Sequence, residues 1–197
     1  MSDTVARPKE FEPDEALDKA MHQFWAKGYH DTSIRDLVAR TGVNYYGLYG
    51  EFANKRGLFL AALDRYRDTV TAEILRELKR PGPARPAIER AFEVLLALMK
   101  TRDGRVGCLM GNTAIELGPS DAEAAAKVRA HMKLLRDAFR AKLLQGQEAG
   151  ELPADADVGA LAEFLATTAY GAGFLLRAGC GDAHVRRHIR TALSALG

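Results

Sequence analysis

The sequence predicts an all-α protein of about nine helices, in which a small amino-terminal helix-turn-helix head precedes a larger helical body. Apolar residues recur at spacings of three and four along most of the 197 residues. No segment shows the strict alternation of a half-buried strand. Gly, Pro, Asn and Asp interrupt the apolar pattern at intervals that suit helices of ordinary length. These observations favour helices throughout and no sheet.

The head is expected to contain three helices before a fourth that leads into the body. The first begins at Pro13, a residue suited to a first turn, and ends at Gly28. Two short helices follow between 32 and 50. The fourth begins near Asn54 and runs toward the breaker at 81–83, Pro-Gly-Pro. We place a domain boundary inside this fourth helix, which divides the chain into 1–60 and 61–197.

Five further helices are expected in the body, each set off by a breaker or a cap. They are a helix around 88–99, a short helix that follows a loop at 102–107 and ends at Gly118, a long helix opened by a capping box of Ser120 and Glu123 and stopped near Gly150, a helix from Asp155 to Gly179, and a last helix from Asp182 to about Ala195. The body is therefore predicted to be entirely helical.

The stretch 32–55 has the pattern of a DNA-binding helix-turn-helix. Ser33 and Asp36 fit a capping box that opens its first helix. Gly42 suits the positive φ of a tight corner, and Asn44 suits the cap of the second helix. The second helix carries three tyrosines, which are large rings with polar tips, and one plainly buried leucine. A helix with one face in the core and one in the major groove explains this composition.

Composition narrows the class of protein. The chain has no run of 18 apolar residues, and its first 18 residues are interrupted by charge, so we expect a cytoplasmic protein with no membrane partner. Its two cysteines, Cys108 and Cys180, lie far apart with no CxxC motif, which argues against a disulfide scaffold or a zinc site. We predict no metal and no cofactor. The formal net charge of +2 is weak support for a nucleic-acid partner, although 32–56 holds four basic residues against two acidic ones.

The head resembles the DNA-binding domain of the TetR family of transcriptional regulators over roughly 11–63. The family pattern ends with a Tyr on the recognition helix, an aromatic residue at its end and a Lys opening the next helix, here Tyr49, Phe52 and Lys55. Upstream, the passage 25–29, WAKGY, precedes Thr32 as the family's aromatic-Gly-aromatic passage does. The resemblance implies a DNA-binding domain at 1–60, a ligand-binding and dimerisation domain at 61–197, and no enzyme activity. It also implies a homodimer that binds a palindromic operator in double-stranded DNA, most often a repressor released by a small-molecule effector.

The resemblance and the helix pattern together indicate the DNA-binding residues. These are Thr32, Ser33, Arg35, Asn44, Tyr45, Tyr46, Gly47, Tyr49 and Lys55. Arg35 is expected to contact either a guanine or a phosphate. Tyr45, Tyr46 and the bare backbone of Gly47 are expected to face the bases, while Tyr49 and Lys55 hold phosphates. The two adjacent tyrosines stand where relatives commonly have smaller or charged residues, so the target sequence does not carry over.

Relatives also indicate where the body dimerises and where it binds its effector. The dimer is expected to form through the last two helices, with small and apolar residues at helical spacing: Ala160, Phe164, Thr167, Thr168, Gly171 and Leu175. The alternative is that these residues pack within one chain. The effector is expected to be small and either apolar or electrophilic, in a cavity lined by Phe92, Leu95, Met99, Cys108, Leu109, Asn112, Met132, Phe139, Tyr170 and Phe174. His131 either faces this cavity or is a structural residue.

Cys108 raises a second possibility for how an effector acts. The segment 107–117, GCLMGNTAIEL, resembles a subset of the family in which the matching cysteine senses electrophiles or oxidants. Arg102, Arg105 and the first turn of a helix would lower the pKa of this thiol, whereas the apolar residues that follow it suggest burial. Redox or electrophile sensing through Cys108 is therefore an alternative to non-covalent binding.

Two hypotheses from other classes have weaker support. An enzyme would need Cys108 or Glu116 paired with His131, and neither pair has a third orienting group or a recognisable motif. A helical protein-interaction module would have little reason to carry Tyr49 and Lys55 at this spacing. The sequence therefore favours a DNA-binding regulator over both.

Overall fold

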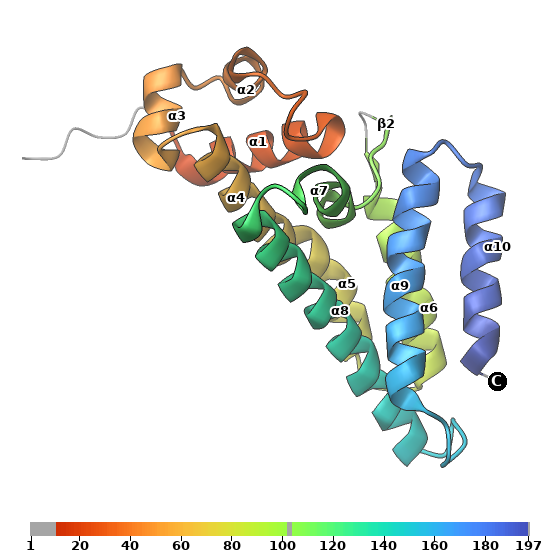
Figure 1. Ribbon diagram of the computed structural model, residues 1–197. Coiled ribbons are helices and arrows are strands. Elements are labelled where there is room, and N and C mark those ends of the chain that lie inside the picture. The colour runs from red at the N-terminus through yellow and green to blue at the C-terminus, as the bar shows by residue number, and fades with distance from the viewer. Residues whose placement is uncertain (1–10, 102–103, 197) are drawn as a thin grey trace, which may run out of the picture. The chain divides into compact units, whose positions relative to one another are not determined.

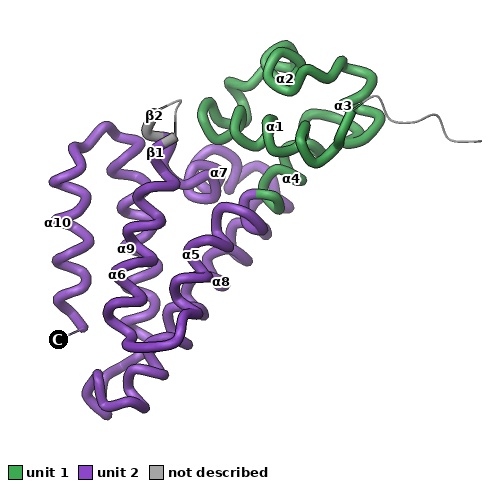
Figure 2. Tube along the Cα trace, turned by 180° about the vertical axis from the view of Figure 1, so that it is seen from behind, with its two compact units in different colours: residues 1–65 green, residues 66–197 purple. Residues whose placement is uncertain are grey.

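The computed structural model describes residues 11–101 and 104–196, which fold almost entirely into helices (Figure 1). Ten α-helical segments are present in these ranges. Because α4, a π-helical segment and α5 run on without a break, they make nine continuous helices, as predicted. The chain divides into two compact units, 1–65 and 66–197 (Figure 2).

The first unit is a helical head. It contains α1 (Pro13–Lys27), α2 (Ile34–Thr41), α3 (Tyr45–Phe52) and most of α4 (Lys55–Tyr66). Its core gathers aromatic rings from α1 and α4, with the Phe24 and Phe59 rings edge to face at 5.0 Å between centroids. Asp18 of α1 accepts two hydrogen bonds from the Arg65 guanidinium, at 2.6 and 2.7 Å, so a bidentate ion pair joins the same two helices.

Local sequence signals begin and end the head helices where expected. The Ser33 hydroxyl accepts a hydrogen bond from the Asp36 N–H at 3.1 Å, and the Asp36 carboxylate accepts one from the Ser33 N–H at 2.9 Å. This reciprocal pair is the predicted capping box. Gly42 ends α2 with a φ of +75°, and the Asn44 side chain accepts the Gly47 N–H at 2.8 Å to open α3. The predicted turn chemistry is confirmed at all three positions.

The long helix predicted from Asn54 toward Pro81 is confirmed and contains one irregularity. After α4, residues Arg67–Thr71 form a π-helical turn, and α5 (Ala72–Lys79) continues the helix. A single π turn inside an α-helix amounts to one inserted residue, and such turns are common at functional sites. No Gly or Pro lies in this turn, so backbone flexibility and a missing N–H do not explain it.

The body consists of α5 and five further helices. They are α6 (Ala84–Leu98), α7 (Leu109–Leu117), α8 (Ala122–Glu148), α9 (Val158–Arg177) and α10 (Asp182–Leu193), after which Ser194–Leu196 form a short 3₁₀ turn. Within the body α5 packs on α6, α8 packs on α9, and α9 packs on α10 (Figure 1). Phe92 of α6 stacks on Phe139 of α8, with 5.7 Å between ring centroids, in the core.

The predicted caps in the body are one or two residues from the observed ones. Asp121 caps α8 by accepting the N–H groups of residues 123 and 124, so the predicted Ser120 box does not form. Asp157, and not Asp155, caps α9. Gly181 precedes α10, and the predicted cap Asp182 is its first helical residue. Because carboxylates recur every few residues at these starts, tertiary packing selects which of them caps the helix.

One feature of the body has strand geometry. Lys100–Thr101 (β1) and Gly104–Arg105 (β2) pair antiparallel where the sequence predicted only a loop and no sheet. Two residues on each side are too few to show any periodicity in the sequence.

Among the described helices, α9 alone combines a length of 20 residues with a mean hydropathy of 1.3, enough by length and composition to cross a membrane. Its inner face is buried against α8 and α10. A core helix passes the same test, and the packing of α9 assigns it to the core of the body.

Candidate DNA interface, effector cavity and dimer face

The outer face of α3 is a surface of tyrosine rings. Tyr45 is 50% exposed and Tyr46 is 85% exposed, although both are large aromatic residues that usually pack against other side chains. The Tyr45 ring contacts those of Tyr46 and Tyr49, with centroids 5.5 and 4.5 Å apart. On the opposite side Leu48 is buried in the head. The helix therefore has one face in the core and one aromatic face exposed to solvent.

Tyr49 and Lys55 lie at the joint between α3 and α4. The Tyr49 hydroxyl is buried, and its proton has no acceptor among the described residues, although the Lys55 N–H lies near its oxygen. Burial raises the pKa of this phenol, Tyr45 and Tyr29 add to the effect, and the nearby Lys55 N–H only partly opposes it. The phenol therefore remains protonated and able to donate a hydrogen bond. The Lys55 ammonium lies 4.4 Å from the centroid of the Tyr29 ring and opens α4, where helical N–H groups attract anions.

An unusual backbone turn brings α3 and α4 together. Ala53 has a φ of +64°, and the Asn54 N–H bonds the Phe52 carbonyl at 2.7 Å. This is a γ-turn with positive φ, a conformation that is strained for a residue with a Cβ. Ala53 is the only non-glycine residue with positive φ in the described part of the chain. Strain is therefore concentrated beside the predicted phosphate contacts.

The exposed side of α2 supplies the remaining predicted contacts. Arg35 of α2 and Ser33, the N-cap of this helix, are both exposed. The capping contacts lower the pKa of Asp36 to about 2, first through the Ser33 N–H and then through the Lys27 ammonium at 3.0 Å. The carboxylate therefore stays ionised, and its charge is directed to the cap and to Lys27.

Two residues predicted to contact DNA face inward instead. Thr32 is 0% exposed, and its hydroxyl donates to the Gly28 carbonyl at 2.6 Å. Gly47 lies on the inner side of α3, where an added Cβ would be 2.8 Å from a methyl carbon of Val43. The prediction is wrong for both: Thr32 closes the turn after α1, and Gly47 permits close packing of α3. Asn44 is exposed, with its side chain engaged in capping.

The body encloses a small cavity with mixed walls. Its lining comes from α4, the π turn, α5, α6, the start of α7, α8 and α9: Tyr66, Thr71, Ile74, Leu95, Met99, Cys108, His131, Leu135, Ala169 and Tyr170. The free space is only about 10 Å³, room for about one water molecule. Its wall has no Lys, Arg, Asp or Glu. A drug-sized ligand does not fit this space unless side chains move.

The polar groups of this cavity form a chain through His131. One ring nitrogen lies 3.0 Å from the Thr71 hydroxyl, and the other lies 2.6 Å from the Tyr170 hydroxyl. A neutral imidazole has one donor and one acceptor nitrogen, and hydroxyl groups can match either. Burial lowers the pKa of His131 to about 4, and the charge of Arg67 acts in the same sense. His131 is therefore neutral near pH 7 and connects α9 to the π turn.

Cys108 lies in the cavity wall as a buried thiol. It is 5% exposed, and burial raises its pKa despite hydrogen bonds from the Gly111 N–H at 3.5 Å and the Tyr66 hydroxyl at 3.7 Å. Arg102 and the side chain of Arg105, which were expected to lower this pKa, lie outside the described residues. Of the two alternatives, burial is confirmed and the pKa is raised, because Cys108 precedes α7 inside the core.

Packing also explains the sequence around Cys108. Gly107 has a φ of +67°, and a Cβ there would be 2.7 Å from the Gly173 carbonyl oxygen. A Cβ on Gly173 would in turn lie 3.2 Å from that of Cys108. The passage from 107 to 108 thus runs directly against the backbone of α9, where only small residues fit.

The predicted cavity residues divide into two groups. Leu95, Met99, Cys108 and Tyr170 line the cavity. Phe92, Leu109 and Phe139 are buried in the core elsewhere, Asn112 donates to the Val106 carbonyl at 2.9 Å, and Met132 and Phe174 are exposed. The prediction is wrong for Met132 and Phe174, which face solvent. It stays a prediction for the other four, because helical spacing does not distinguish a cavity wall from ordinary core. Neither Cys108 nor Glu116 is a hydrogen-bond partner of His131, which contacts Thr71 and Tyr170 instead.

The outer face of α9 is an apolar strip. Ala160, Phe164 and Thr167 are exposed on it, and Leu175 is partly exposed. Gly171 lies at its edge and faces His188 of α10. Phe164 is 48% exposed and Phe174, one turn from Gly171, is 62% exposed. Thr168 does not belong to this strip, because it is buried and donates to the Phe164 carbonyl at 2.9 Å. The prediction of Thr168 as an interface residue is wrong, and Phe174 is better placed in this strip than in the cavity.

Sequence comparison agrees with both halves of this architecture. Residues 16–62 match the bacterial regulatory proteins of the tetR family, and residues 84–193 match the tetracyclin repressor-like C-terminal domain. The chain belongs to the TetR family. The second match covers more than half of the chain and the first covers the helix-turn-helix, so membership does not depend on one motif.

Similar TetR proteins extend over nearly the whole chain. The chain is 37% identical to the HTH-type transcriptional repressor ComR of Escherichia coli K12, over 88% of this chain and 83% of that protein. It is 31% identical to the HTH-type transcriptional regulator YezE of Bacillus subtilis 168, over 98% of this chain and 100% of that protein. The TetR family regulator CifR, solved as a cysteine mutant complexed with 26 bp operator DNA, is 27% identical with a TM-score of 0.86, covering 96% and 99% of the two chains.

Half of the cavity wall consists of residues that were not predicted from the sequence. Tyr66, Thr71, Ile74, Leu135 and Ala169 line it but were not among the expected ligand residues. Thr71 carries no signal in the sequence, because its place in a π turn is not visible from helical spacing. His131 fits both alternatives, because it lines the cavity and has a hydroxyl partner at each ring nitrogen.

Proposed function

We propose that this protein is an effector-responsive transcriptional repressor that binds a palindromic operator as a homodimer in the cytoplasm. The observation that carries the proposal is the exposed tyrosine face of α3 beside an unpartnered Tyr49 hydroxyl and the amino end of α4. A polar group that is buried without a partner is costly unless a ligand completes it. A DNA phosphate would complete this one once the Tyr49 ring turns outward, because the hydroxyl has no contact with solvent in the free protein. ComR is a repressor and CifR binds operator DNA, and both similarities support the same conclusion.

The residues divide between phosphate contact and base contact. Tyr49 and Lys55 are assigned to phosphate, because both lie where α4 begins. Tyr45 and Tyr46 are assigned to the bases, because they are the exposed rings of α3. Arg35 lies on the outer side of α2 and is assigned to a base or a phosphate.

The effector is assigned to the cavity around His131. A wall of apolar residues with neutral hydroxyl, imidazole and thiol groups selects a small uncharged molecule with one or two polar atoms. Such a molecule would exchange partners with Tyr170 and His131 and so reach Thr71 in the π turn. Coupling requires that the effector bind two forms of the protein differently. The continuous helix from α4 to α5 is the element through which this difference would reach the head.

Covalent sensing by Cys108 is a second candidate. Its support is the resemblance of the segment 107–117 to relatives of that kind, together with the position of Cys108 in the cavity wall. Burial and the raised pKa of the thiol oppose it, since the thiolate is the reactive form. Replacing Cys108 with Ser distinguishes covalent sensing from non-covalent binding of the effector. We expect operator release by an uncharged effector to survive this change, and a loss of release would favour covalent sensing.

The first experiment is selection of genomic fragments by the purified protein at about physiological salt, where non-specific binding fades. We expect enrichment of one palindromic site.

Tyr49→Phe should then weaken operator binding several-fold without lowering protein stability, because it removes only the unpartnered hydroxyl. Lys55→Ala should weaken binding to all sequences alike. Absence of any enriched site, or operator affinity that survives both changes together, would contradict the proposed DNA interface.

A further inference from the structure

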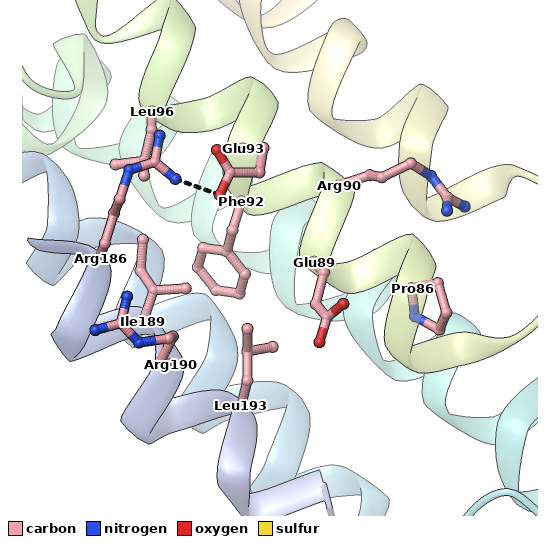
Figure 3. A pocket seen from close by; sticks show the side chains of 10 residues that line it. All are labelled: Pro86, Glu89, Arg90, Phe92, Glu93, Leu96, Arg186, Ile189, Arg190 and Leu193. Atoms are coloured by element: carbon pink, nitrogen blue, oxygen red, sulfur yellow. Dashed lines mark hydrogen bonds and ion pairs between the residues drawn. The ribbon is translucent and has the colours of Figure 1, made fainter.

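A groove lies on the surface of the body between α6 and α10 (Figure 3). Its volume of about 480 Å³ is within the range of small-molecule sites. Phe92 and Leu96 of α6 and Ile189 and Leu193 of α10 form an apolar floor. The groove shares no lining residue with the cavity around His131. It is therefore separate from the proposed effector cavity.

Among the charged residues at the rim of this groove, Arg190 has no ion-pair partner among the described residues. The ion pairs there are Arg186 with Glu93, Arg90 with Glu77, and Glu89 with Arg85. Arg190 is exposed at the same rim, and no described residue is its hydrogen-bond or ion-pair partner. The groove thus combines an apolar floor with one uncompensated positive charge.

The groove and the predicted dimer face use different sides of α10. His188 faces α9, where a Cβ added to Gly171 would be 3.2 Å from its Nε2 atom. At about 100° per residue, Arg190 is roughly 160° around the helix from His188. A partner seated on the outer face of α9 therefore approaches the far side of α10 from the groove.

We propose that the groove is a second small-molecule site, which binds an amphipathic monocarboxylate. The apolar part of the ligand lies on the floor between α6 and α10, and its carboxylate accepts hydrogen bonds from Arg190, whose planar guanidinium suits a carboxylate. An uncharged ligand would leave Arg190 unused, and a cation would be repelled by it. A dianion would lack a second free guanidinium, because Arg186 is paired with Glu93 and Arg90 shares Glu77 with Arg80.

The five isoleucines of the chain allow the two sites to be observed separately. Ile189 lies in the groove and Ile74 lies in the cavity wall. With methyl-labelled isoleucine in the full-length protein, titration with octanoate should shift the NMR signal of Ile189 and leave that of Ile74 in place. Octan-1-ol and octylammonium should bind more weakly. Arg190→Gln should weaken octanoate binding by about three- to tenfold, whereas Arg187→Gln, the same charge change elsewhere on α10, should not.

Several outcomes would overturn the proposal. They are an unmoved Ile189 signal, equal binding of octan-1-ol, and octanoate affinity that is unaffected by Arg190→Gln. Leu193→Trp fills the groove and should abolish the Ile189 shift, so a shift that persists would also place the ligand elsewhere. An Ile189 signal that changes on dilution without ligand would assign the groove to a second copy of the chain.

Discussion

At the scale of single residues, the environment of a side chain decides its chemistry more than its type does. Three tyrosines of α3 share one helix, yet Tyr46 is exposed while the Tyr49 hydroxyl is buried without a partner. The two groups are chemically identical, but only the second would gain a hydrogen bond with DNA without first giving up one to water. The two histidines His131 and His22 also differ in environment, because His131 is buried between two hydroxyls and His22 is exposed on α1.

His131 should make stability depend on pH. Its pKa is about 4 in the folded protein against 6.5 for an unperturbed histidine, so between these values the unfolded chain binds more protons. Stability is therefore complete above about pH 6.5 and falls as pH decreases toward 4, by at most about 3 kcal/mol at 1.36 kcal/mol per pKa unit. Urea unfolding between pH 7 and 4.5 measures this. His131→Phe should flatten the dependence and His22→Gln should not, and an equal slope in all three proteins would contradict the assignment.

Substitutions of Ala53 should show whether the turn between α3 and α4 is strained. Glycine has no Cβ and adopts positive φ readily, so Ala53→Gly should stabilise the protein by up to about 1 kcal/mol, partly offset by the greater freedom of glycine in the unfolded chain. Ala53→Val should destabilise it by more than about 1 kcal/mol, because a β-branched residue is strongly disfavoured there. The measurement is the urea midpoint of each variant. A stability order other than Gly, Ala, Val would mean that the turn is not strained.

At the scale of elements, the helix formed by α4, the π turn and α5 is continuous from the head into the body, so the proposed mechanism depends on it. The π turn ends at Thr71, whose hydroxyl bonds His131 of α8. Because the same His131 bonds Tyr170 of α9, three helices meet at one imidazole. Under the proposed function, a change at the cavity would therefore reach the π turn through His131.

Thr71→Val should break this connection. It keeps the shape of the side chain but leaves a ring nitrogen of His131 without a partner, which costs about 1–3 kcal/mol for a buried group. Amide exchange of residues 67–75 should accelerate, because the π turn loses its tie to α8. Thr71→Ser is the matched control, since it retains the hydroxyl and should restore most of the protection. Unchanged exchange in the valine variant would show that the bond does not hold the turn.

At the scale of the whole molecule, the protein needs two heads to read a palindrome. One short recognition helix offers few base contacts, so a two-fold interface is needed to place a second one. The apolar strip on α9 is the described surface that suits this interface, because it exposes Phe164 and Phe174 beside small residues.

Phe164→Glu should therefore dissociate the dimer, since association would desolvate a charge. Light scattering should show a monomer, and binding to the palindromic operator should weaken at least about tenfold while binding to a half-site is unchanged. Ile115→Glu is the control, because Ile115 is also an exposed apolar residue but lies on α7. A dimer that persists with Glu at 164 would move the interface elsewhere.

The sequence by itself determined the elements and the class of protein. Helical periodicity, the Ser33 and Asp36 capping box, Gly42 and Asn44 act within a few residues of each other, so they are readable without tertiary structure. Tertiary structure alone decided which side chains meet across helices. It buried Thr32, turned Gly47 inward, placed Thr168 in the core and Phe174 at the surface, and gathered Thr71, His131 and Tyr170 around one cavity. Helical spacing marks a face as apolar, but the packing of neighbouring helices determines whether that face becomes core, cavity wall or interface.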